Sequence, residues 1–360
     1  MKHKLKVIVA GIGVSLMLFV GVVSAFNYDA LQKYFSKDEE TIQNNIKAMS
    51  TEKLISEMNM LSPVLVGANE VDSLIPFAAE LRRRKDVIQN SDIIKELKKN
   101  TNSQLTKEIL VDLYADKNAN QPNQDDLKQL LQDESIDNRL KTKIVNVAQF
   151  NSNDTKILKK LIEGQDAGLA FASLKQMSRI DLEEADKNSN QILLNYKTEP
   201  AEKVSAALKA KSKYLVTKKS KGDFEAQAKE FIQLGFDIIT TSNDTKLRDA
   251  AFFAISDLRI KESIKNILKN DLIDRELKVY AVDQHFEVLN EMLINQPTEE
   301  EIETVVEAME LLPISDLIVP LEESSKRIEN ADLKQRCEEV LAFMKTNGVS
   351  GNKKWSDGVK

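Results

Sequence analysis

The chain has 360 residues, of which 42% are hydrophobic and 30% are charged, and its 57 acidic and 51 basic residues give a net charge of −6. The hydrophobic share suffices to bury the core of one large domain or of two ordinary ones. The acidic balance argues against general nucleic-acid binding, and the single cysteine, Cys337, cannot form an internal disulfide.

The residue composition favours an all-α protein. The chain holds only 11 glycines and 7 prolines, while Leu, Ile, Lys, Glu, Asp and Ala dominate. No stretch alternates apolar and polar residues between Asn-Gly or Asp-Gly turns, so the pattern gives little support for a β-sheet. We therefore expect helices from end to end.

The first 25 residues resemble a secretory signal peptide. Three lysines precede an uncharged run at residues 7–25, which ends in Val23-Ser24-Ala25, and small residues at the last and third-last positions are typical of a cleavage site. The alternative is an uncleaved membrane anchor, because 19 residues at ~1.5 Å each nearly cross the ~30 Å hydrocarbon layer. In both cases the lysines are expected to stay inside, so the rest of the chain is predicted to be secreted or otherwise extracytoplasmic.

Residues 26–130 are expected to form an N-terminal helical region. Apolar residues recur there at helical spacing. We expect Pro63 to end one helix and Pro76 to lie in the first turn of the next. The most polar loop of the chain, residues 116–126, is the predicted joint to the part that follows. The predicted helix starts are Thr51, Ser91 and either Asn102 or Ser103.

After this loop the apolar stripes recur in pairs, as in helical hairpins. The clearest pair lies within residues 243–269, where Asp244 precedes an amphipathic segment. Leu277-Lys278 repeats Leu247-Arg248 thirty positions on. Further along, Thr298 and Glu301 have the spacing of a capping box. The polar tail at residues 347–360 is expected to be disordered.

Residues 246–258, Lys-Leu-Arg-Asp-Ala-Ala-Phe-Phe-Ala-Ile-Ser-Asp-Leu, resemble the first helix of a HEAT repeat of the short, bilin-lyase type. Residues 260–269 resemble its second helix. The next unit keeps its start but has His285 in place of the aliphatic partner of Ile255. The resemblance covers residues 131–346 and implies a right-handed α-solenoid of HEAT-like hairpins, with an extended face used mostly for protein contacts. Its core is expected to contain Leu247, Ala251, Ala254, Ile255, Leu258, Ile264, Ile267, Leu277 and Ala281.

The pentapeptide Ser-Asn-Asp-Thr-Lys occurs twice, at residues 152–156 and 242–246. The interval of ninety residues fits repeat ancestry. Reuse of a good helix N-cap is the simpler interpretation, because a short helix is predicted after the first copy and a long one after the second.

Two basic runs are candidate contacts for an anionic envelope polymer, a membrane surface or an acidic protein. A solvated face is the alternative for both runs, because acidic stretches such as residues 299–301 balance them. The first run is Arg82, Arg83, Arg84 and Lys85, and the second contains Lys209, Lys211, Lys213, Lys218 and Lys219.

The other candidates for chemistry have simpler explanations. His285 is the only histidine after the signal segment and has no neighbours at metal-ligand spacing, so we expect a structural residue. Residues 116–120 and 186–190 begin like calcium loops but lack the glycine and the glutamate that such loops need. We interpret them as solvated connections between helices. Cys337 is expected to be an ordinary helix residue, with a reactive thiol as the alternative.

These observations predict a protein-interaction scaffold or adaptor at the bacterial cell envelope, with no enzyme activity and no cofactor. One alternative is a lyase-like HEAT enzyme or a regulatory subunit of an envelope enzyme, for which polar groups would have to converge in a pocket around His285. The other alternative is a membrane-tethered spacer. A mature N-terminus at Phe26 would exclude the tether.

Overall fold

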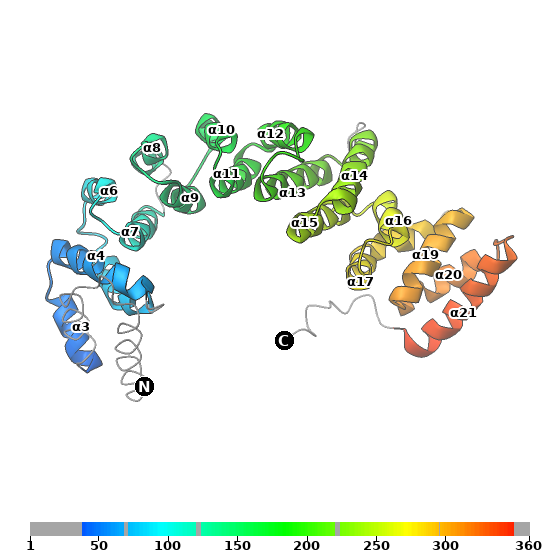
Figure 1. Ribbon diagram of the computed structural model, residues 1–360. Helices are drawn as coiled ribbons and strands as arrows, with labels where there is room; N and C mark the ends of the chain where they lie inside the picture. Colours follow the sequence, from blue (N-terminus) through cyan, green and yellow to red (C-terminus); the bar gives the residue numbers. More distant parts are fainter. Residues whose placement is uncertain (1–37, 68–70, 120–123, 220–223, 295, 349–360) are drawn as a thin grey trace. The chain divides into compact units, whose positions relative to one another are not determined.

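The computed structural model describes residues 38–67, 71–119, 124–219, 224–294 and 296–348 (Figure 1). The predicted signal or anchor segment and nearly all of the predicted disordered tail lie outside these residues. Within them, no helix combines the length and the apolarity that crossing a membrane requires.

The described part of the chain is all-α, as the composition predicts. It contains 19 α-helices and no strand. The chain divides into two compact units, residues 1–176 and 177–360, and the division falls within α11 (Ala167–Ile180). The predicted boundary near residue 130 concerns where the HEAT-like repeats begin, and it stays a prediction.

The first unit contains α3 (Glu39–Lys47), α4 (Thr51–Gly67), α5 (Ile75–Arg83), α6 (Asn90–Lys98), α7 (Gln104–Lys117), α8 (Asp125–Gln129), α9 (Asn138–Val147) and α10 (Thr155–Glu163). Helix α7 is central to its packing, because α4, α5, α6 and α9 all contact it.

The second unit contains α12 (Leu182–Leu194), α13 (Ala201–Lys218), α14 (Phe224–Thr241), α15 (Thr245–Ser256), α16 (Lys261–Lys269), α17 (Arg275–Gln284), α18 (Phe286–Leu293), α19 (Glu299–Leu311), α20 (Ile318–Ser325) and α21 (Ala331–Asn347). Consecutive helices pack together as α12 with α13, α14 with α15, and α20 with α21. Next-but-one helices also pack together, as α13 with α15, α17 with α19, and α19 with α21. Helix α13 therefore lies beside α15, and α19 lies beside both α17 and α21 (Figure 1).

Side chains cap several helices where the sequence predicts caps. Ser103 and Asp244 each accept a hydrogen bond, 3.1 Å long, from the N–H of the third residue of the following helix. Thr298 and Glu301 form the predicted reciprocal capping box. Each cap satisfies an N–H that has no partner within the helix. The prediction for Ser91 is wrong, because α6 begins one residue earlier and has no side-chain cap.

The two prolines of the first unit differ in outcome. Pro76 lies in the first turn of α5, as predicted. Pro63, predicted to end a helix, instead lies inside α4. An interior proline costs about 3 kcal/mol in an isolated helix. Here Leu61 and Leu65, on either side of Pro63, are both buried, and their packing holds the helix together across the proline.

Residues 186–190 form a turn of α12, so both interpretations of this stretch, as a calcium loop and as a solvated connection, are wrong. Helix α12 starts at a cap by Asp181, whose side chain accepts a hydrogen bond from the backbone N–H of Glu184. The Asn188 amide donates to the Glu184 carbonyl at 2.7 Å, and Asn188 is buried. The buried Asn188 amide therefore has its hydrogen-bond partner within the helix.

Both copies of the repeated pentapeptide start a helix at the threonine. Helix α10 begins at Thr155 and α15 begins at Thr245. The aspartates before them differ, because Asp244 caps its helix whereas Asp154 provides no side-chain cap. Asp154 instead accepts a hydrogen bond of 2.8 Å from the buried Lys128. The interpretation as a helix N-cap therefore holds only for the second copy, at residues 242–246.

The residues predicted for the core of the second unit are buried with one exception, since Leu277 is only half-buried. Gly235 lets α14 approach α15 closely: a Cβ atom at this position would lie 2.4 Å from Cγ2 of Ile255. His285 lies thirty residues after Ile255, and both side chains are fully buried. The offset of thirty residues therefore pairs two core positions.

Candidate interaction surface

Two aromatic rings are exposed and in contact on the second unit, one on α15 and one on α17. Phe253 is 41% exposed and Tyr280 is 40% exposed. Their ring centroids are 5.5 Å apart and their planes meet at 86°, an edge-to-face arrangement. Phe252 is buried, and its ring centroid lies 5.3 Å from that of Phe253 and 6.4 Å from that of Tyr280.

Helix geometry explains why Phe253 faces outward. Successive residues of an α-helix are about 100° apart, and Ala251, Ala254 and Ile255 form the buried stripe of α15. Phe253 lies outside this stripe, on a side of the helix that solvent can reach. Burying a phenylalanine side chain gains about 1.5–3 kcal/mol, so leaving much of the ring in water forgoes stability that a bound partner can recover.

Two aspartates flank the rings. Asp257 follows Phe253 by four residues and Asp283 follows Tyr280 by three, spacings that bring side chains to the same side of a helix. Asp257 and Asp283 both lie close enough to Tyr280 for their charges to raise the pKa of the phenol, although burial of the phenol raises it more. We call Phe253, Asp257, Tyr280 and Asp283 the aromatic–acid surface.

Asp257 is exposed and Asp283 is half-buried, and the protein around each carboxyl group still displaces part of its water. Burial raises the pKa of Asp257, against the opposing charges of Arg259 and Lys209. Burial also raises the pKa of Asp283, against a hydrogen bond of 3.3 Å from the Gln284 amide. Among the described residues, neither carboxylate forms an ion pair. A desolvated carboxylate without a cation is unfavourable, and a bound cation would stabilise it.

Arg259 marks the edge of the aromatic–acid surface, in the connection between α15 and α16. Its φ of 47° is in the left-handed region, which is strained for a residue with a side chain. The Arg259 carbonyl accepts a hydrogen bond of 2.9 Å from Nζ of Lys219, and its guanidinium donates to Gln284 at 3.1 Å. These bonds connect α13 and α17 to the strained residue and hold the edge of the surface in place.

The first predicted basic run has partners inside the first unit. Glu80 is buried and accepts hydrogen bonds from Arg83 at 2.8 Å and from Arg84 at 2.6 Å. The bond from Arg83 is the main cause that lowers the pKa of Glu80 to about 2. Lys85 lies 3.8 Å from Asp116. Three cations of the run are thus paired within the chain.

Arg84 also reaches another helix end. Its guanidinium donates to the Met49 carbonyl at 2.6 Å and to the Lys47 carbonyl at 2.9 Å. These carbonyls lie at and just after the C-terminus of α3, where no intrahelical donors remain. Arg84 is therefore a structural link between α3 and α5. Arg82 is exposed and forms no ion pair among the described residues.

The second predicted basic run is mostly engaged as well. Nζ of Lys211 lies 2.9 Å from Oδ1 of Asp186, and both side chains are about nine-tenths buried. Lys213 donates to the Ser178 carbonyl at 2.7 Å. Lys218 forms an ion pair with Glu183 of α12, and Lys219 donates a hydrogen bond to the Arg259 carbonyl. Lys209 is exposed on α13. These contacts hold the second unit together and give little support to the run as a binding patch.

His285 is a buried residue at the junction of α17 and α18. Its Nδ1 lies 2.8 Å from the Ala281 carbonyl, so Nδ1 donates, and Nε2 has no hydrogen-bond partner in the described part of the chain. Burial, assisted by the charges of Arg259 and Lys219, lowers the pKa of His285 to about 4. The ring is therefore neutral near pH 7 and is not exposed to solvent.

The described ranges contain no group of three or more His, Cys, Asp or Glu side chains arranged to hold a metal ion. Cys337 is fully buried in α21, and burial is the main cause that raises the pKa of its thiol to about 11. The thiol is thus protonated and inaccessible. In the first unit, a cavity of about 330 Å³ has an apolar wall that includes Ile55, Leu81 and Leu110.

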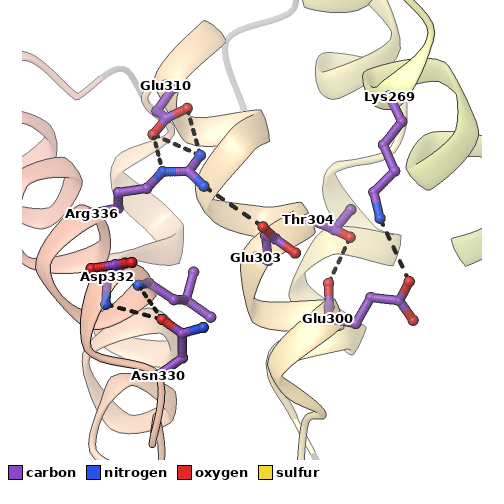
Figure 2. A network of polar contacts seen from close by, with 9 residues as sticks. Lys269, Glu300, Glu303, Thr304, Glu310, Asn330, Asp332 and Arg336 are labelled. Atoms are coloured by element: carbon purple, nitrogen blue, oxygen red, sulfur yellow. Dashed lines mark hydrogen bonds and ion pairs between the residues drawn. The ribbon is translucent and has the colours of Figure 1, made fainter.

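A polar network joins the last helices of the second unit (Figure 2). Arg336 of α21 donates to both carboxylate oxygens of Glu310 at 3.1 Å and lies 3.8 Å from Glu303. Glu303 and Glu310 lie on α19. Glu300, on the same helix, lies 3.6 Å from Nζ of Lys269 on α16. Such exposed pairs each contribute at most about 1 kcal/mol. These glutamates therefore form ion pairs, whereas Asp257 and Asp283 form none among the described residues.

The aromatic–acid surface was not predicted from the sequence. Its signal was present in residues 246–258, where Phe253 is a large apolar residue outside the stripe that the helical period predicts. The sequence predicts that the ring is exposed only after the buried residues of the helix have been assigned. The contact with Tyr280, 27 residues later, depends on the tertiary fold. Comparison with protein families, with curated proteins and with solved structures finds no match to this chain.

Proposed function

We propose that the protein is an interaction module built of HEAT-like helical hairpins, wound as a right-handed solenoid, and that it binds a protein partner through the aromatic–acid surface. The observation that carries the proposal is the exposed edge-to-face pair of Phe253 and Tyr280. Aromatic side chains supply most of the binding energy at many protein interfaces, because each buries a large area at little entropic cost.

The surroundings of the pair suit such a role. Phe252 packs beneath both rings, and the buried residues Ala251 and Ile255 fix the backbone of α15. A binding site works best when a rigid scaffold holds its side chains in place before the partner arrives. The pairing of consecutive helices and the contacts between next-but-one helices support the stacked-hairpin architecture.

We place this module at the bacterial cell envelope, because residues 1–25 resemble a signal peptide. The intact mass of the protein isolated from cells tests this part. A mature chain that starts at Phe26 supports secretion and argues against the membrane-tethered spacer. A chain that keeps residues 7–25 favours the anchored form.

The enzymatic alternative, a lyase-like HEAT protein or a regulatory subunit, depended on polar groups around an accessible His285. The ring is buried and donates to a backbone carbonyl. This geometry does not favour His285 as a catalytic acid or base, since no substrate can reach it.

Photo-cross-linking in living cells tests the interaction. The photoreactive residue p-benzoyl-phenylalanine replaces Phe253 or Tyr280, and in a matched control it replaces Phe343, which is 52% exposed on α21. We expect discrete cross-linked adducts at positions 253 and 280, identified by mass spectrometry, and none at 343. Equal adducts at all three positions, or none at 253 and 280, would contradict the proposal.

A further inference from the structure

We propose that the aromatic–acid surface binds a cationic side chain, a lysine or an arginine on a basic segment of the partner. This inference rests on the proposed function, because it names the chemistry that the same surface recognises. It is drawn from the ring geometry, the state of the two carboxylates and the positions of the cations nearest to them.

The rings provide the first part of a cation site. A cation within about 6 Å of an aromatic centroid is attracted to the electron-rich face of the ring. Phe253 and Tyr280 stand almost perpendicular to each other, so the exposed rings offer aromatic surface in two directions. Since each ring is about 40% exposed, a long side chain can lie against them without displacing core residues.

The carboxylates provide the second part. Asp257 and Asp283 form no ion pair within the described ranges, whereas other acids of the same unit do, such as Asp186 with Lys211 and Glu310 with Arg336. A cation that binds here would therefore meet two carboxylates that have no ion-pair partner among the described residues. An apolar segment would bury these charges without compensation, and an acidic segment would be repelled by them.

The chain's own cations favour one side of the surface. The charges of Arg259 and Lys209 act on Asp257, and the charge of Arg259 also acts on Tyr280. Among the described residues, Asp283 forms no ion pair and accepts a hydrogen bond of 3.3 Å from the Gln284 amide. The guanidinium of Arg259 is held by Gln284. Asp283 is therefore the carboxylate left for a bound cation, and Tyr280, three residues before it on α17, is the ring expected to contact the same cation.

Fluorescence anisotropy with the full chain tests the inference. The probe is a labelled peptide of alternating lysine and glycine with blocked ends, and the comparison peptides carry acetyl-lysine or glutamate in place of lysine. We expect Tyr280→Leu and Asp283→Asn each to weaken binding of the lysine peptide at least about tenfold, since each change removes one recognition element. The acetylated and acidic peptides should not bind.

Matched variants exclude general effects of charge or folding. Phe343→Leu removes an exposed aromatic ring elsewhere, and Glu230→Gln removes an exposed acid from α14. Both should bind the lysine peptide like the unmodified chain, and all variants should keep the same circular dichroism spectrum. An equal loss in Glu230→Gln would reduce the effect to net charge and overturn the inference. Full binding by Tyr280→Leu would also overturn it.

The two proposals fail in different ways. If the lysine peptide does not bind while photo-cross-links at positions 253 and 280 persist, the cationic partner is wrong and the interaction module stands. If the cross-links are absent as well, the proposed function fails together with the inference.

Discussion

On α13, lysines that the sequence marks as a binding patch are directed to partners within the chain, as Lys211 is to Asp186 and Lys213 to a backbone carbonyl. On α15 and α17, Asp257 and Asp283 lie beside exposed aromatic rings and have no ion pair within the described residues. The number of charges in a stretch therefore says little about binding. What matters is whether a charge has a partner within a few ångströms, because a paired charge gains little from a second partner.

Breaking the buried pair on α13 should have the largest effect. Lys211→Met leaves the Asp186 carboxylate buried without its cation, and we expect a loss of about 3 kcal/mol in the free energy of unfolding. Urea unfolding followed by circular dichroism measures it. Lys209→Met, on the exposed side of the same helix, should change stability by less than about 0.5 kcal/mol. Similar effects of the two substitutions would mean that Lys211 is not a structural residue.

His285 provides a second contrast, between a buried polar group and its apolar counterpart Ile255. The unfolded imidazole takes up a proton near its ordinary pKa of 6.5, whereas the folded one does so only at about 4. The folded state is therefore destabilised as the pH falls from 6.5 to 4, by about 3 kcal/mol in total.

His285→Ile removes this titration and the unpartnered Nε2. We expect the variant to be at least as stable as the unmodified chain at pH 7, and its advantage to grow by about 3 kcal/mol between pH 7 and pH 4. Urea unfolding across this pH range measures the difference. A constant difference would show that the histidine titrates normally and is accessible to water.

In the first unit, Arg82 and Arg84 allow the same comparison between an exposed and a structurally bound cation within a single basic run. Arg84→Ala removes the bonds to Glu80 and to two carbonyls at the end of α3, and we expect a loss of about 2 kcal/mol. Arg82→Ala, at an exposed position, should cost less than about 0.5 kcal/mol. Thermal unfolding of the two variants side by side measures both. Equal losses would contradict the structural role of Arg84.

Periodicity and caps predicted much of the fold because they are local. The starts of α7, α15 and α19 follow from Ser103, Asp244 and the Thr298 capping box, whose hydrogen bonds span only three residues. The prediction that Pro63 ends a helix is wrong for the opposite reason. The packing of Leu61 and Leu65 that keeps α4 continuous comes from contacts with other helices, and local sequence rules do not include it.

The candidate site depends even more on long-range contacts. Phe253 and Tyr280 are 27 positions apart in the sequence and meet only because the fold brings these residues of α15 and α17 into contact. The basic runs were visible as composition, but their partners, such as Asp186 for Lys211, are on other helices. A sequence shows which residues carry charge. Packing decides which of those charges remain available.

The smallest effect on stability is expected at the aromatic–acid surface itself, with the double substitution Asp257→Asn and Asp283→Asn. Because burial raises both pKa values, the two ionised carboxylates destabilise the fold near pH 7. The variant should therefore melt at the same temperature or slightly higher, with a gain of no more than about 0.5 kcal/mol.

As the pH falls through the raised pKa values, the carboxyl groups of the unmodified chain become neutral and the difference should vanish by about pH 3. Thermal unfolding at both pH values measures this. A clear loss of stability in the variant at pH 7 would mean that the aspartates, like Lys211, serve the fold. Unchanged stability together with lost peptide binding would separate the two regions completely, one used for folding and the other for recognition.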